Sequence, residues 1–225
     1  MKITESSNVL REETFDIDHP EVSIATVASE VRIAPSPDGK CHVAIYGKFD
    51  AKNLDEYVDI SSKNHSLTIR VDKHNRGLRG FLNSISTRFL VVVQLPTTAA
   101  LKITTISGDV DVEQTVSSID INCISGSISV QHNPNGPCAL KTISGDIATH
   151  TFSGCDYSLN SISGDIRVHI APDLEVDVDG KSISGTLESE ISLNSNAQTS
   201  PTNSETVVIT ASTISGDFTL ARNEF

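Results

Sequence analysis

The feature that most constrains the fold of this chain is a tripeptide that recurs through its second half. Ile-Ser-Gly occurs at intervals of 18, 19, 19, 21 and 31 residues. Its copies begin at Ile106, Ile124, Ile143, Ile162, Ile183 and Ile214. Self-similarity at a nearly fixed period indicates a repeat architecture, in which each unit buries its apolar side only against its neighbours. The chain is therefore expected to be a stack of similar units.

The residues around each tripeptide alternate in the manner of strands. In the first copy, Ile103 and Thr105 precede the tripeptide at alternate positions, and Val110 and Val112 follow it. A period of two is strand patterning. The alternation slips by one residue between Thr105 and Ile106, which requires that the chain turn a corner there. Each repeat is therefore predicted to be two short strands joined at a bend.

The tripeptide itself is expected to serve the core and the bend. We expect its isoleucines to form a buried ladder, each worth about 1.5–3 kcal/mol when fully buried. Its glycine is expected where a Cβ would clash or φ is positive, and the aspartate that usually follows would accept hydrogen bonds from turn amides. These structural turn positions are Gly108, Asp109, Gly126, Gly145, Asp146, Gly164, Asp165, Gly185, Gly216 and Asp217.

The N-terminal part is predicted to contain degenerate copies of the same unit. The segment from Ile24 to Ile33 overlays the one from Ile103 to Val112 without a gap. A second overlay places Ile60, Leu67 and Ile69 at the offsets of Ile103, Val110 and Val112, with Lys63 replacing the ladder isoleucine.

We therefore predict an all-β protein, a single-stranded parallel β-solenoid of about eight rungs of ~19 residues. It would comprise an N-terminal arm over residues 1–14 and one domain over residues 15–225, with degenerate rungs over 15–100 and regular rungs over 101–225. Residues 192–205, which are polar and contain a proline, are predicted to be a loop inserted in the fifth regular rung.

Composition and charge agree with this fold class and exclude some functions. Aromatic residues make up 4% of the chain and there is no Trp, yet 37% is apolar, so the core must consist of Ile, Val and Leu. A net charge of −12 argues against nucleic acid as a partner. The four cysteines lack metal or redox spacing, so we expect buried free thiols.

The ends of the chain predict where it resides. Charged residues such as Glu5 and Arg11 stand where a secretory signal would need an apolar run, and no stretch approaches the length of a membrane span. The sequence therefore predicts a cytoplasmic protein with no transmembrane segment, for which peripheral association with the envelope stays open.

The segment from 89 to 96, with Val-x-Val-x-Leu-Pro, and the later Thr-x-Ser-Gly-Asp-Ile-like rungs resemble the bacterial putative-adhesin family, a domain of unknown function. The residues that carry this likeness are Phe89–Pro96, Thr105–Val110, Thr142–Ile147, Ser161–Ile166 and Thr213–Phe218. The resemblance covers roughly residues 15–225. It implies a single-chain parallel β-solenoid without established catalytic residues, often linked to the bacterial envelope or its stress response.

The strongest candidate for a binding site is the segment over residues 72–88. It carries Lys73, Arg76, Arg79 and Arg88 in an otherwise acidic chain, together with Phe81 and Leu82. Such a cluster could dock anionic lipid, a phosphate-rich glycopolymer or an acidic protein. The alternative is a long loop whose charges only keep it soluble.

Two other constellations favour structural interpretations. Asp146 and Asp165 on adjacent rungs could hold Ca²⁺ or act as a glycosidase pair, but turn capping explains them better. His150 and His169 should stack outward on neighbouring rungs, where they could begin a zinc site, but a third ligand is not evident. We therefore predict no catalytic, metal or cofactor site.

The sequence accordingly predicts a non-enzymatic binding or scaffold protein, whose partner is an unknown protein or an envelope glycopolymer or lipid. Two alternatives stay open. One is a self-assembling cytoplasmic β-solenoid scaffold in the manner of bactofilins, for which charged residues at both ends argue against free addition of strands. The other is a carbohydrate-active enzyme on a β-helix. A homo-oligomer is compatible with either kind of scaffold.

Overall fold

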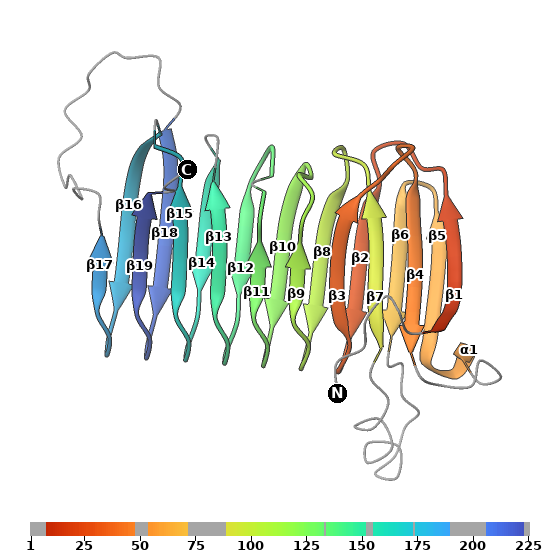
Figure 1. The fold of residues 1–225 in the computed structure, drawn as a ribbon, viewed down its shortest axis with the longest axis horizontal. Coiled ribbons are helices and arrows are strands. Elements are labelled where there is room, and N and C mark those ends of the chain that lie inside the picture. The colour runs from red at the N-terminus through yellow and green to blue at the C-terminus, as the bar shows by residue number, and fades with distance from the viewer. Residues whose placement is uncertain are drawn as a thin grey trace, which may run out of the picture.

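The computed structural model describes residues 8–47, 54–71, 89–132, 134–151, 155–172, 174–189 and 206–222. In these residues the chain is all-β apart from one short helix, α1 (Leu54–Tyr57), and its strands form two sheets. Figure 1 shows the strands side by side along the long axis of the molecule, with one sheet in front of the other.

The ten-stranded sheet contains the second strand of each regular repeat. Its spatial order is β1 (Asn8–Phe15), β4 (Cys41–Gly47), β7 (Leu90–Leu95), β3 (Glu30–Pro35), β9 (Val110–Val112), β11 (Ile128–Val130), β13 (Ile147–Thr151), β15 (Ile166–Ile170), β19 (Phe218–Arg222) and β17 (Leu187–Ser189).

The nine-stranded sheet contains the first strand of each regular repeat. Its order is β16 (Glu175–Ser182), β18 (Thr206–Thr213), β14 (Asp156–Asn160), β12 (Cys138–Lys141), β10 (Ser118–Cys123), β8 (Ala100–Thr105), β2 (Glu21–Thr26), β6 (Ser66–Val71) and β5 (Val58–Lys63). A rung is thus one strand of this sheet, a bend, and one strand of the ten-stranded sheet.

The regular rungs stack in parallel and in register, as the repeat predicts. Ile103 of β8 pairs with Ile121 of β10, and Ile121 pairs with Leu140 of β12. Side chains at these positions are buried between the two sheets. The buried core is made mainly of Ile, Val and Leu, which confirms the prediction drawn from the composition.

The order of the rungs in space departs from their order in the chain at the C-terminal end. The sixth tripeptide rung, β18 and β19, lies between the fourth and the fifth. This rung buries Val207, Ile209 and Leu220, whereas the fifth rung has Gly180 beside Ala211 and Ser189 beside Leu220 at inward positions. The more apolar rung therefore takes the position with neighbours on both sides, where it buries more apolar surface.

The N-terminal end also differs from a purely parallel solenoid. The overlay of Ile24 on Ile103 is confirmed, because these residues are paired in β2 and β8. The overlay of Leu67 on Val110 is wrong: Leu67 pairs with Val22, which pairs with Leu101 in the nine-stranded sheet. The cause is a β5–β6 hairpin, whose turn uses the positive φ of Asn64.

Antiparallel pairing therefore closes the N-terminal end. Strand β1, which includes residues 8–14 of the predicted arm, pairs antiparallel with β4, β4 pairs antiparallel with β7, and β5 pairs antiparallel with β6. The rung made of β2 and β3 lies between the rung of β6 and β7 and that of β8 and β9. The described fold is thus two mixed, mostly parallel sheets rather than a row of rungs in chain order.

Candidate binding surfaces

The bends expose the isoleucines of the tripeptide, which corrects the prediction of a buried ladder. Ile106 is 45% exposed and Ile183 is 79% exposed, whereas Thr105, directly before Ile106, is only 1% exposed. The strand alternation continues through Thr105 and Ile106, and the change of face falls in the Ser-Gly-Asp stretch. The inner side of the corner between the two sheets is therefore occupied by the small residue before each isoleucine.

These small inward residues donate hydrogen bonds to the main chain of the neighbouring rung. Thr142 Oγ1 donates a hydrogen bond to the carbonyl oxygen of Gly126 at 3.4 Å, and Ser182 Oγ donates to that of Gly216 at 3.0 Å. Within the described residues, Thr105 Oγ1 is the exception, because it is buried without a hydrogen-bond partner. The residue before each isoleucine is thus usually Ser or Thr because its hydroxyl group is satisfied by a hydrogen bond to the neighbouring rung.

The glycines of the tripeptide are required by the close approach of adjacent bends. A Cβ on Gly145 would lie 2.2 Å from the carbonyl oxygen of Gly126, and one on Gly164 would lie 2.0 Å from that of Gly145. The corresponding distance is 2.4 Å or less at Gly108, Gly126, Gly185 and Gly216. No other residue fits these positions without separating the rungs.

The aspartates after the glycines also connect one rung to the next. The Oδ1 atom of each accepts a hydrogen bond from a main-chain N–H of the adjacent rung: Asp109 from Ser127, Asp146 from Asp165, Asp165 from Asp217, and Asp217 from Thr186, at 2.8–3.0 Å. Arg167 forms ion pairs with Asp165 at 2.6 Å and Asp146 at 3.6 Å. The carboxylates of the bends are therefore engaged in holding the stack together. Among the described residues, no group of three or more His, Cys, Asp or Glu is arranged to hold a metal ion.

The exposed isoleucines turn one side of the nine-stranded sheet into a distinctive surface. We call it the isoleucine face: the outward side chains of β8, β10, β12, β14, β18 and β16, together with the isoleucines at their bend ends. Nine large apolar residues are exposed in the described part of the chain, and seven of them, the six isoleucines and Val208, lie on this face. The parallel ladder continues into the bends, where Ile124 N donates to Thr105 O at 3.1 Å, so the isoleucines stand in register.

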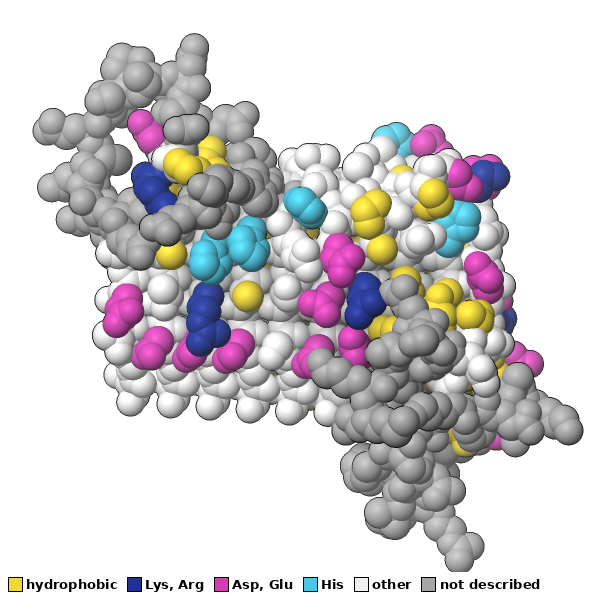
Figure 2. Space-filling model, viewed as in Figure 1, with side chains coloured by type: hydrophobic (Ala, Val, Ile, Leu, Met, Phe, Trp, Pro, Cys, Tyr) yellow, Lys and Arg dark blue, Asp and Glu magenta, His cyan; other side chains and the backbone are white. Residues whose placement is uncertain are grey.

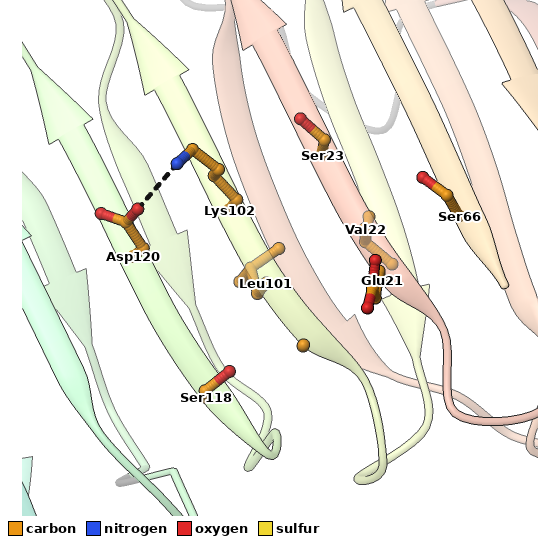
Figure 3. A pocket seen from close by; sticks show the side chains of 9 residues that line it. Glu21, Val22, Ser23, Ser66, Leu101, Lys102, Ser118 and Asp120 are labelled. Atoms are coloured by element: carbon orange, nitrogen blue, oxygen red, sulfur yellow. Dashed lines mark hydrogen bonds and ion pairs between the residues drawn. The ribbon is translucent and has the colours of Figure 1, made fainter.

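A shallow hollow of about 300 Å³ lies on the outer side of the same sheet, across β6, β2, β8 and β10. Small residues, Ser23, Ser66 and Ser118, line it beside the longer Glu21. In Figure 3 the ion pair between Lys102 and Asp120, 3.0 Å long, stands at one side of it. The hollow exists because these small side chains lie between longer ones.

The opposite outer surface carries a stacked pair of histidines. His150 and His169 are paired in β13 and β15, and their ring centroids are 4.9 Å apart with an angle of 18° between the planes, which confirms the predicted stacking. Figure 2 shows histidine side chains gathered over the C-terminal rungs. Partial burial, followed by the proximity of His169 and His132, lowers the pKa of His150.

All four cysteines are free and buried, as predicted. Burial raises the pKa of Cys41 and of Cys155 to about 11, and raises that of Cys138 further. The thiolate form, which is the nucleophile and the metal ligand, is therefore strongly disfavoured. These thiols act as small apolar core residues.

The predicted basic segment, with Lys73, Arg76, Arg79 and Arg88, lies outside the described residues, and so does the predicted loop over 192–205. The strands on either side of the basic segment do show where it is attached. Arg70 of β6 pairs with Ala25 of β2, and Leu90 of β7 pairs with Glu30 of β3, so the two strands correspond to those that flank a bend in the adjacent rung. The end of β6 and the start of β7 thus lie at the edge where the regular rungs have their tripeptide bends.

The isoleucine face was missed from the sequence, although the alternation contained the signal. If the in-and-out pattern of Ile103, Thr104 and Thr105 is continued by one residue, Ile106 falls outside. The assumption that an apolar residue repeated in every unit must be buried overrode that pattern.

The fold and these surfaces define a class of repeat proteins made of two facing, mostly parallel sheets with close-packed glycine bends. Among solved structures, the chain is similar to a putative cell adhesion protein from Clostridium sporogenes, with a TM-score of 0.54 and 11% identity over 95% of this chain and 99% of the other. It is also similar to a putative adhesin from Bacteroides fragilis, with a TM-score of 0.46 and 13% identity over 95% and 96% of the two chains.

The sequence model of the Toastrack DUF4097 family matches residues 19–153 and, in a second alignment, residues 97–221. The chain therefore belongs to the Toastrack DUF4097 family. A comparison with curated proteins gives no match. In the described part of the chain, no helix is both long and apolar enough to span a membrane.

Proposed function

We propose that this protein is a non-catalytic binding scaffold that docks a phosphate-bearing partner of the bacterial envelope through the basic segment over residues 72–88. The observation that carries the proposal is the attachment of this segment. It joins two strands, β6 and β7, that correspond to β2 and β3, which a short bend joins in the adjacent rung. A rung that keeps its strands but exchanges a short bend for 17 residues fixes the strands on both sides of that insertion.

The composition of the segment supports a phosphate-bearing partner. Arg76, Arg79 and Arg88 carry guanidinium groups, which form bidentate hydrogen bonds with phosphate. The rest of the chain is strongly acidic, since the net charge is −12 with these cations included. Phe81 and Leu82 add apolar side chains of the kind that enter a lipid interface. Anionic lipids and phosphate-rich glycopolymers share this chemistry.

A scaffold role without catalysis is supported by what the repeated polar residues do. The bend aspartates accept main-chain hydrogen bonds between rungs, and the buried hydroxyl groups donate to glycine carbonyls. The repeated groups thereby serve to join rungs. The name of the structurally similar protein from Clostridium sporogenes, a putative cell adhesion protein, agrees with a binding role.

The proposal is tested by co-sedimentation of the full chain with vesicles of phosphatidylglycerol and phosphatidylcholine. The variant Arg76→Glu, Arg79→Glu, Arg88→Glu should lose most of the binding. The control variant Lys40→Glu, Lys63→Glu, Lys141→Glu changes the net charge equally at other sites and should retain binding. Equal binding by both variants contradicts the proposal.

Soluble polyglycerol phosphate serves as the second arm of this experiment. Binding to the free polymer that is stronger than binding to vesicles, and that is lost in the arginine variant, identifies a glycopolymer as the partner. Binding to the vesicles alone identifies lipid.

A further inference from the structure

We propose that two copies of this chain associate face to face through the isoleucine face, with a two-fold axis that crosses the middle of the isoleucine row. The starting observation is the concentration of apolar surface described above, in which seven of the nine exposed large apolar residues in the described chain share one face. Contiguous apolar surface of this kind on a soluble protein marks an interaction site.

The spacing of the isoleucines indicates that the partner is a second copy. In-register parallel strands place the side chains of one column about 4.8 Å apart. A second row meshes with the first along its whole length only when it has the same period, as in the dry interfaces between stacked identical strands. An identical chain supplies that period without any further requirement.

The order of the strands fixes which rungs would meet. Along the isoleucine row the strands run β8, β10, β12, β14, β18 and β16. A two-fold axis through the middle of this row places β8 opposite β16 of the second copy, β10 opposite β18, and β12 opposite β14. Ile106 then faces Ile183 of the other copy, Ile124 faces Ile214, and Ile143 faces Ile162, so every isoleucine of the row has a partner.

The charges on the face agree with this arrangement. Lys102 of β8 and Asp179 of β16 occupy the same column of the sheet, because the strand register connects them through Asp120, Ala139, Ser158 and Thr210. The two-fold axis places Lys102 of each copy opposite Asp179 of the other. In the next column, Thr104 faces Lys181 and Lys141 faces Asn160. No like charges meet in these two columns, and one pair of opposite charges does, so these columns favour the two-fold arrangement.

The size of the face sets the strength that we expect. Six strands make it about 25 Å long, and six residues per strand make it about 20 Å wide. Stable complexes bury upward of roughly 600 Å² of accessible surface on each partner. A flat face of these dimensions covers about 500 Å², just below that value. Dimerisation should therefore be weak and concentration-dependent rather than obligate.

The test is sedimentation equilibrium of the full chain over a range of concentrations. The wild type should show a reversible monomer–dimer equilibrium. Ile143→Thr with Ile162→Thr, which keeps a β-branched side chain at each position, should raise the dimer dissociation constant at least about tenfold. Val9→Thr, at another exposed apolar residue away from this face, serves as the matched control and should leave the constant unchanged.

A charge exchange separates specific docking from any effect of the isoleucines on folding. Lys102→Glu alone and Asp179→Lys alone should each weaken the dimer, and the double variant should restore it. Failure of the double variant to restore dimerisation overturns the proposed arrangement. A wild type that stays monomeric at every concentration but sediments with phosphatidylglycerol vesicles when the isoleucines are intact, and not after their replacement, assigns the face to a membrane and also overturns the proposal.

Discussion

Replacing Gly145 by alanine tests the physical reason for the repeated glycines. The Cβ of the variant would lie 2.2 Å from the carbonyl oxygen of Gly126, whereas Cβ atoms essentially never approach closer than 3.0 Å. The two bends must therefore move apart by most of an ångström. The hydrogen bonds nearest the contact, from Ser144 N to Ile124 O at 2.9 Å and from Gly126 N to Ser144 O at 3.2 Å, would be stretched.

The expected cost follows from these losses. Two stretched hydrogen bonds contribute roughly 0.5–1.5 kcal/mol each, and forcing a methyl group into a packed site costs about 1–3 kcal/mol. The lower entropy of the unfolded alanine chain offsets about 0.4–1 kcal/mol, but the φ of +159° at Gly145, which residues other than glycine rarely adopt, adds strain. The free energy of unfolding should therefore fall by at least about 3 kcal/mol, which urea denaturation followed by circular dichroism will measure.

Gly180→Ala provides the matched control. A Cβ at Gly180 in β16 would meet the Phe218 ring at 3.4 Å, which is an ordinary contact. Alanine is favoured over glycine within a strand, so this variant should be neutral or stabilised by up to about 1 kcal/mol. A Gly145→Ala protein as stable as Gly180→Ala would refute the argument from close approach.

Two further results are expected from the buried hydroxyl groups and the histidine pair. Thr142→Val removes a hydrogen bond to Gly126 and should lower the free energy of unfolding by about 1 kcal/mol. Thr105→Val replaces a hydroxyl that is buried without a partner among the described residues, so this variant should be neutral or stabilising. Equal losses of stability in urea denaturation would contradict this reasoning. The folded state holds the pKa of His150 below its ordinary 6.5, so the unfolded chain binds more protons between the two values. The contribution of His150 is therefore fully present above about pH 6.5 and is lost as the pH falls through the folded pKa. His150→Gln should flatten the loss of stability that begins as the pH falls below about 6.5, and an unchanged pH dependence would show that the stacked ring is not its source.

The stacking of the regular rungs could be predicted because it depends on a local pattern that every rung repeats. The alternation around Ile103 and Val110, together with the nearly constant interval, specifies two strands and their register. The overlay of residues 24–33 succeeded for the same reason. The stacking of His150 and His169 could be predicted from the register alone, because equivalent positions on neighbouring rungs lie side by side.

What could not be predicted depends on competition between distant segments. The β18–β19 rung lies between the fourth rung and the β16–β17 rung, although it comes last in the chain. This order reflects which of the last two rungs is more apolar, and the local pattern of neither rung specifies it. The interval of 31 residues and the small residues Gly180 and Ser189 were the local signs that these rungs differ. The antiparallel strand β5 was misplaced because the turn at Asn64 was not recognised.

The identity of the bend residues shows a different limit. The repeated pair of a small residue and an isoleucine, as in Thr105 and Ile106, indicates that both positions are constrained, but not which of the two faces the core. The corner has room inside for a small residue whose hydroxyl reaches a glycine carbonyl, as Ser161 and Thr213 do. The larger isoleucine lies outside, which left a candidate interaction surface that composition alone could not reveal.

The most direct test of the proposed function is to replace residues 72–88 by a short Gly-Ser connection and measure binding to phosphatidylglycerol vesicles. Phe89 is kept, because it is buried in the core. Since β6 and β7 correspond to strands that a short bend joins in the adjacent rung, the variant should fold, with an unchanged circular dichroism spectrum and cooperative unfolding. We predict that its affinity for the vesicles is at least about tenfold lower than that of the wild type. A folded variant that binds as well as the wild type contradicts the assignment of the basic segment as the docking element.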